Sequence, residues 1–133
     1  MGVRMRVLLD TNAFLWAVRQ PDKLSDTAEE TLSTRDNELI VSAVTPWELA
    51  IKYHLGKLPE AAPVIADYAA TLVRLGASSL PITHTHTLHA GLMEWSHRDP
   101  FDRLLAATAI IEGLPIVSVD AIFDQLPDVG RIW

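Results

Sequence analysis

Cysteine is absent from this sequence, and its absence excludes disulfide frameworks, thiolate zinc sites and cysteine nucleophiles. No apolar run reaches the ~18 residues that a membrane-spanning helix needs. The short apolar stretch near the N-terminus is interrupted by Asp10, and no signal-peptidase pattern follows it. We therefore expect a cytoplasmic protein that makes no membrane contact.

Positive charge is also scarce, because 11 Lys and Arg residues stand against 17 Asp and Glu residues, a net charge of −6. This balance argues at first against a nucleic-acid partner, since phosphate binding usually requires a basic surface. The objection weakens if several carboxylates share a divalent cation that cancels part of their charge. Apolar residues make up 49% of the 133 residues, enough for one core, so we expect a single domain over residues 1–133.

Short apolar segments alternate with amphipathic ones along the chain. The patterns predict strands over 5–10, 38–43, 79–82 and 115–119, with a short edge strand over 130–133. They predict helices over 12–19, 26–35, 45–55, 63–75, 85–93 and 100–112. Strands that alternate with helices indicate an α/β fold with a mostly parallel sheet.

Two similar motifs mark the starts of two of these helices. In the first, Thr45 is the expected cap, Pro46 takes the first helical position and Glu48 stands three residues after the cap. Asp99-Pro100-Phe101-Asp102 repeats the pattern, with Asp99 as the expected cap. Helix capping by itself is thus a sufficient structural explanation for Glu48, and also for Asp102.

Four acids nevertheless share a predicted location. Asp10 ends the first strand, Asp120 closes the fourth, and Glu48 and Asp102 lie in the first turns of helices. The carboxyl ends of parallel strands meet at one edge of a sheet, where four carboxylates would repel one another unless they bound a hard divalent cation. We therefore predict that these four acids form the catalytic and metal-binding site for Mg²⁺ or Mn²⁺, suited to water activation and phosphoryl displacement.

Several neighbouring polar residues are ambiguous. Asn12 is equally suited to orient a carboxylate and to cap the first helix. Arg103 is a candidate to contact a phosphate or an acid, although an ordinary surface arginine is the simpler interpretation. His97 is a candidate to line the site. Three further histidines, His84, His86 and His89, are too irregularly spaced for a zinc site.

Four segments resemble the PIN-domain family, and within it the VapC-type toxins of bacterial toxin–antitoxin pairs. They are LLDTNAFLW, SAVTPWELAIKYHLGKL, HRDPFDRLLAATAIIEGLPIVSVD and the closing RIW, which stand in order across nearly the whole chain. The resemblance implies a PIN-like three-layer fold, a mostly parallel sheet flanked by helices. It also implies an RNA endonuclease that depends on Mg²⁺ or Mn²⁺ and leaves a 5′-phosphate and a 3′-hydroxyl.

The same resemblance assigns roles to individual residues. Asp10, Glu48 and Asp102 match the three central acids of the family, Asp120 its more variable fourth position, and Asp99 a common additional acid. The sequence does not decide whether Asp99 or Asp120 is the fourth functional acid.

The resemblance also names partners. It implies a homodimer, an RNA substrate and a small antitoxin protein that blocks the acidic site, often with a basic side chain. Lys52 and Arg103 are candidates to steady the scissile phosphate.

Three other functions compete with this one. A phosphatase of the haloacid-dehalogenase type also begins with a strand that ends in aspartate, but it needs a second acid where Asn12 stands. A response-regulator receiver needs paired N-terminal acids, which this sequence lacks. In a non-catalytic module that binds a metal, RNA or a partner, the acids would only cap helices.

Overall fold

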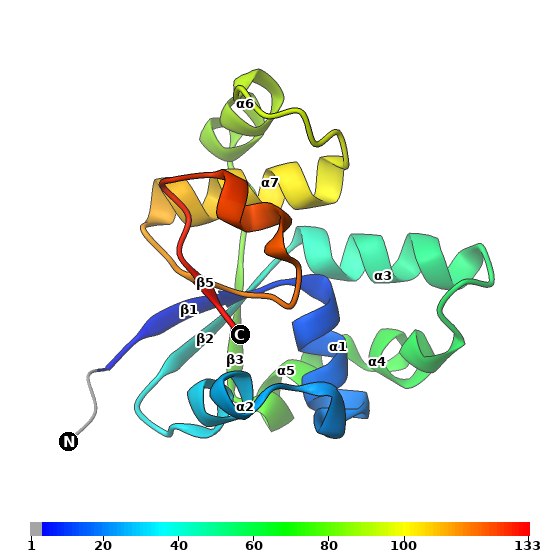
Figure 1. Ribbon diagram of the computed structural model, residues 1–133. Helices are drawn as coiled ribbons and strands as arrows, with labels where there is room; N and C mark the ends of the chain where they lie inside the picture. Colours follow the sequence, from blue (N-terminus) through cyan, green and yellow to red (C-terminus); the bar gives the residue numbers. More distant parts are fainter. Residues whose placement is uncertain (1–3) are drawn as a thin grey trace.

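The computed structural model describes residues 4–133, and its centre is a sheet of five strands in the order β3-β2-β1-β4-β5 (Figure 1). The strands are β1 (Arg6–Leu9), β2 (Glu38–Ser42), β3 (Ala77–Leu80), β4 (Ile116–Val117) and β5 (Arg131–Ile132). Every pair of neighbouring strands is parallel, which confirms the predicted α/β fold. Residues 1–3 of the predicted domain lie outside the described residues.

Helices connect the strands. They are α1 (Thr11–Arg19), α2 (Asp26–Ser33), α3 (Val44–His54), α4 (Ala62–Ala66), α5 (Tyr68–Leu75), α6 (His84–Leu92) and α7 (Pro100–Glu112). Three short 3₁₀ turns accompany them: η1 (Pro21–Lys23), η2 (Pro59–Ala61) and η3 (Ala121–Gln125). Among residues 4–133, none of these helices is long and apolar enough to cross a membrane.

The sheet is covered on both faces because its strands are apolar on both faces. In β1, Val7 and Leu9 belong to one core cluster and Leu8 to the other, and all three are fully buried. Helices α1, α2 and α5 pack on the first face, and α7 with η3 packs on the second (Figure 1). Each fully buried leucine contributes roughly 1.5–3 kcal/mol to this three-layer arrangement.

The predicted helix over 63–75 is wrong as a single element. The chain breaks into α4 and α5 at Asp67, whose carboxylate accepts a hydrogen bond from the backbone N–H of Ala70 at 3.2 Å. Aspartate favours such capping bonds over a helix interior, so an apolar period that runs through it does not guarantee a continuous helix.

The two helix-start motifs have different outcomes. Asp99 caps α7 as predicted, because its Oδ1 accepts from the N–H groups of Phe101 at 2.9 Å and Asp102 at 3.1 Å. The prediction for Thr45 is wrong. Helix α3 begins one residue before it, at Val44, and its cap position, Ala43, offers no side-chain bond.

Candidate functional site

A polar cleft of about 170 Å³ lies at the carboxyl edge of the sheet. Its walls come from the end of β1 and the start of α1, from α3, from the start of α7 and from the segment after β4. The residues that line it are Asp10, Thr11, Asn12, Glu48, Lys52, Asp99, Asp102 and Asp120. The structure thus brings the four predicted acids to one cleft, together with Asn12 and Asp99.

Asp10 is buried, with only 7% of its surface exposed. The register of the sheet places it there, because its N–H donates to the carbonyl of Val117 at 3.1 Å. Its Oδ1 accepts from the N–H of Ala13 at 2.7 Å and caps α1. The cap of α1 is therefore not Asn12, whose exposed side chain remains at the lip of the cleft.

Burial raises the pKa of Asp10 from 3.8 to about 6. Hydrogen bonds from Ser118 and from the Ala13 N–H act in the opposite direction, and the nearby charges of Asp102 and Glu48 raise the pKa further. The three carboxylates therefore interact electrostatically, although they come from three separate segments. A positive ion in the cleft would relieve this repulsion.

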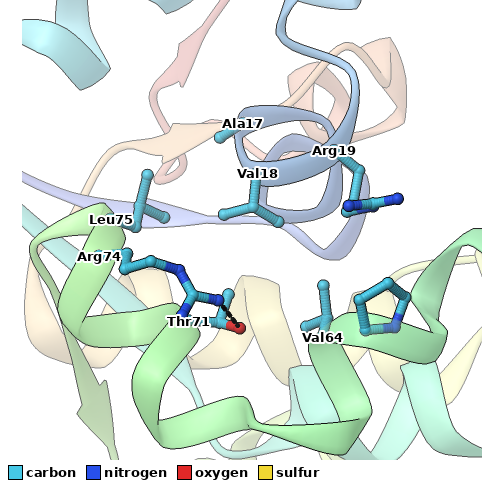
Figure 2. Close-up of a pocket in the computed structure, with 8 residues that line it drawn as sticks. Ala17, Val18, Arg19, Val64, Thr71, Arg74 and Leu75 are labelled. Atoms are coloured by element: carbon cyan, nitrogen blue, oxygen red, sulfur yellow. Dashed lines mark hydrogen bonds between the residues drawn. The ribbon is translucent and has the colours of Figure 1, made fainter.

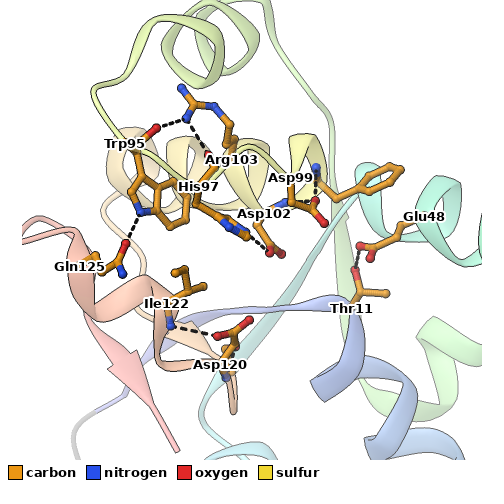
Figure 3. Close-up of polar contacts among 12 residues, drawn as sticks. Thr11, Glu48, Trp95, His97, Asp99, Asp102, Arg103, Asp120, Ile122 and Gln125 are labelled. Carbon is orange, nitrogen blue, oxygen red and sulfur yellow. Dashed lines mark hydrogen bonds and ion pairs between the residues drawn. The ribbon is translucent and has the colours of Figure 1, made fainter.

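Glu48 is buried, and both of its carboxylate oxygens are engaged. The Thr11 hydroxyl donates to Oε1 at 2.6 Å (Figure 3). The Lys52 ammonium, one helical turn later, contacts Oε2. Glu48 therefore faces the cleft instead of completing a capping box. Lys52 is 42% exposed at its side chain, so it lines the cleft as a partly solvated cation.

Asp102 lies at the centre of the group in Figure 3. Its Oδ2 is 2.7 Å from Nε2 of His97, a residue from the segment before α7. Burial raises the pKa of Asp102, while the hydrogen bond from His97 lowers it and the charge of Asp99 raises it. The net direction is upward, as it is for Asp10.

The two remaining acids occupy the rim. Asp120 is exposed, and its Oδ1 accepts from the N–H of Ile122 at 3.0 Å (Figure 3). Asp99 has one oxygen committed to the cap of α7. Both acids are more exposed than the buried Asp10 and Glu48, as expected for side chains at the edge of the cleft.

Arg103 lies outside the cleft. Its guanidinium donates to the backbone carbonyl of Ala90 in α6 and to three carbonyls of the segment between α6 and α7, so these N–H groups do not contact a cleft acid. The histidines of α6 also lie elsewhere. His86 is buried, and its Nδ1 accepts from the N–H of Thr83 at 3.1 Å, which completes the cap of α6.

The acids of the cleft are not yet arranged around a common point. Within residues 4–133, no three Asp, Glu or His side chains lie close enough together to hold one ion as they stand. Glu48 and Asp102 are held by Thr11, Lys52 and His97 instead. Five acids and one base line the cleft, and oxygen is the donor that Mg²⁺ and Mn²⁺ prefer. The residues therefore fit a hard cation, provided that the carboxylates move closer together and that Glu48 exchanges its contact with Lys52 for the cation.

Sequence reasoning missed two contacts of the acids. The first is the bond from Thr11 to Glu48. Its only indication in the sequence is weak: Thr11 carries a hydroxyl and directly follows the candidate acid Asp10. Ser118 hydrogen-bonds Asp10 because Val117, just before it, pairs with Leu9, just before Asp10. Strand register alone reveals that second contact.

A larger cleft of about 310 Å³ lies between α1 and the α4–α5 segment (Figure 2). Val18, Val64 and Leu75 supply apolar walls, and Arg74 donates to the Thr71 hydroxyl at 3.3 Å within it. No carboxylate is among the residues that line this cleft, so it lacks the chemistry predicted for the site.

The chain is similar in sequence to known proteins. A family model described as "PIN domain" matches residues 7–129. Ribonuclease VapC22 of Mycobacterium tuberculosis (strain ATCC 25618 / H37Rv) is 33% identical over 117 residues, which are 86% of this chain and 86% of that protein. Ribonuclease VapC16 of the same organism is 38% identical over 74 residues, 53% of this chain and 52% of that protein, so the match spans about half of its length.

A solved structure shows the same fold. The crystal structure of VapBC2 from Rickettsia felis, bound to a DNA fragment from their promoter, matches with a TM-score of 0.66. The match covers 96% of this chain and 97% of that chain at 19% sequence identity.

Proposed function

We propose that this chain, which belongs to the PIN domain family, is a Mg²⁺- or Mn²⁺-dependent endoribonuclease and the toxin of a toxin–antitoxin pair. The observation that carries the proposal is the single cleft in which Asp10, Glu48, Asp102 and Asp120 meet. Two similar proteins are named ribonucleases, which supports RNA as the substrate. The phosphatase and receiver hypotheses are not supported, because the chain belongs to a different family.

Asp10, Glu48 and Asp102 would hold the cation, with Asp120 at the rim. When bound, such a cation lowers the pKa of a water ligand and offsets charge on a phosphate. The chain itself keeps Asp10 buried against Ser118 and α1, so this carboxylate has a fixed position.

Lys52 and Thr11 supply the remaining groups. In the absence of a cation, Lys52 offsets the charge of Glu48. Once Glu48 turns to a cation, the half-exposed ammonium is free to contact a substrate phosphate at the mouth of the cleft. The Thr11 hydroxyl can keep one oxygen of Glu48 oriented throughout.

The acidic cleft also suggests the chemistry of the partner. An antitoxin that places a basic side chain among these carboxylates would block the site by charge complementarity. The proposal includes a homodimer of the toxin. Sedimentation should then give a mass near twice the 14.7 kDa of one chain, and a monomer at micromolar concentration would contradict that part.

The decisive test is cleavage of total bacterial RNA by the purified protein in Mg²⁺ or Mn²⁺, with and without EDTA. We expect discrete fragments that require the metal and are lost in Asp10→Asn and in Asp102→Asn. Asp36→Asn is a matched control, because Asp36 is exposed and remote from the cleft acids. It should cleave like the wild type.

Other outcomes of this test separate the alternatives. Cleavage that survives in both cleft variants would contradict the assigned site. Absence of cleavage, combined with metal binding that needs Asp10 and Asp102, would favour the non-catalytic binding module.

A further inference from the structure

One side chain, Arg103, makes four hydrogen bonds to backbone carbonyls in the last turn of α6 and in residues 93–97, which lie between α6 and α7. Arg103 donates from Nε to the carbonyl of Ala90 at 2.9 Å and from Nη2 to that of Met93 at 2.7 Å. Its Nη1 donates to the carbonyls of Trp95 at 2.8 Å and His97 at 2.9 Å. A planar guanidinium can satisfy carbonyls on several sides at once, which a lysine ammonium cannot do in the same geometry.

These four hydrogen bonds, which we call the Arg103 clamp, set the position of the His97 ring. The Trp95 ring lies 4.9 Å from the His97 ring and also packs against Phe123. The indole N–H of Trp95 donates to Oε1 of Gln125 at 3.0 Å, which ties the segment to η3 (Figure 3). The imidazole is thus packed on one side and fixed at its backbone, and its exposed fraction is only 27%.

The fixed ring points at a cleft acid. His97 Nε2 lies 2.7 Å from Oδ2 of Asp102. An ionised Asp102 carboxylate can only accept a hydrogen bond, so Nε2 must be the ring nitrogen that carries the hydrogen. The bond to Oδ2 leaves the other carboxylate oxygen of Asp102 for a ligand in the cleft. Arg103 stands next to Asp102 in the chain, yet it reaches that carboxylate only through the segment and the imidazole.

We propose that Arg103 and His97 are positioning residues for Asp102. Arg103 fixes segment 93–97, and His97 holds one carboxylate oxygen of Asp102 so that the other faces the cleft cation. This inference rests on the proposed function, because it concerns the site that would bind the metal. Groups that hydrogen-bond metal ligands typically change metal affinity or activity by about 10–100-fold when they are removed.

A purely structural role makes a different prediction. Removal of the imidazole leaves the four bonds of Arg103 to backbone carbonyls intact, so the fold should persist in His97→Ala. If His97 only supported the segment, metal affinity would not change in this variant. If it positions Asp102, metal affinity falls while the melting temperature remains close to that of the wild type.

The test is Mn²⁺ affinity by isothermal titration calorimetry at one pH, without RNA, alongside the melting temperature. We expect His97→Ala to weaken Mn²⁺ binding by about 10-fold or more. His97→Gln should recover much of this loss, because its amide N–H can donate to Oδ2 without an ionisable ring. His84→Ala, an exposed histidine of α6 outside the cleft, should bind like the wild type.

Arg103→Lys extends the test to the clamp. We expect weaker Mn²⁺ binding together with a lower melting temperature, because lysine leaves several carbonyls without their donor.

Wild-type Mn²⁺ affinity in His97→Ala would overturn the proposal. So would a His97→Gln protein that is folded but binds Mn²⁺ as weakly as the alanine variant. A wild type that neither binds Mn²⁺ nor cleaves RNA would instead refute the proposed function. If the wild type cleaves RNA in a metal-dependent way but His97→Ala binds Mn²⁺ with wild-type affinity, only this inference is refuted.

Discussion

Asp10 combines two roles that usually belong to different residues. Its side chain caps α1, and its carboxylate lines the cleft beside Glu48 and Asp102. Burial makes the ionised form unfavourable, and the cap and Ser118 only partly compensate. A residue in this position costs stability at neutral pH, and a bound cation would offset that cost.

The raised pKa has a measurable consequence. Asp10 binds its proton more tightly in the folded chain, with a pKa of about 6, than at the ordinary value of 3.8. Its contribution to stability is therefore present below about pH 4 and lost as the pH rises through about 6. We expect the stability of metal-free Asp10→Asn, relative to the wild type, to increase across this window by at most about 3 kcal/mol.

Urea unfolding in EDTA at several pH values measures that difference. Asparagine retains an oxygen that can cap α1, so loss of the cap should not mask the effect. A difference between variant and wild type that does not depend on pH would show that Asp10 titrates normally.

Helices α3 and α7 show how similar sequence motifs give different helix starts. Asp99 precedes α7 and has room to accept two backbone N–H bonds. Before α3, the chain turns from β2 into the helix within one residue, and the Ser42 hydroxyl accepts from the N–H of Val44. Thr45 is then inside the first turn and fully buried, and its hydroxyl has no hydrogen-bond partner among residues 4–133.

Thr45→Val is therefore expected to stabilise the protein by about 1 kcal/mol, because it replaces an unsatisfied buried hydroxyl with a methyl group of similar size. If Thr45 were the cap, the same change would cost about 1 kcal/mol. Thr108→Val is a matched control, since the buried Thr108 hydroxyl donates to the carbonyl of Leu104 at 2.7 Å. Urea unfolding should show a gain for the first variant and none for the second.

At the scale of the whole molecule, negative charge is concentrated where the sheet ends. The chain carries −6 overall, and five of its acids line one small cleft beside a single base, Lys52. Parallel topology is the reason, because it brings the ends of β1, β2 and β4 to one edge, together with the helix starts that follow. The fold is therefore electrostatically suited to a divalent cation.

Divalent cations should consequently stabilise the folded protein. Mass action predicts a gain of about 2.7 kcal/mol when the free metal is at 100 times its dissociation constant. We expect Mg²⁺ or Mn²⁺ to raise the melting temperature of the wild type and of Asp36→Asn, but not that of the Asp10→Asn/Asp102→Asn double variant. An equal rise in wild type and double variant would place the metal elsewhere on the surface.

The sequence by itself determined the strand–helix alternation, the parallel sheet and the acids at its carboxyl edge. These features follow from local patterns: apolar runs such as Val7–Leu9, and the aspartate that caps α7. The acids could be predicted as a set because parallel strands end together, whatever the details of packing.

Only the tertiary structure decided which groups hold the acids. The bond between Thr11 and Glu48 joins residues 37 positions apart, and the contact of Ser118 with Asp10 depends on strand register. Arg103 directly follows Asp102 in the sequence, and His97 stands five residues before it. The sequence pattern around them nevertheless does not show that the arginine points away from Asp102 and holds a backbone segment. Such contacts are set by how distant elements pack, and the periodicity of a single element carries no information about them.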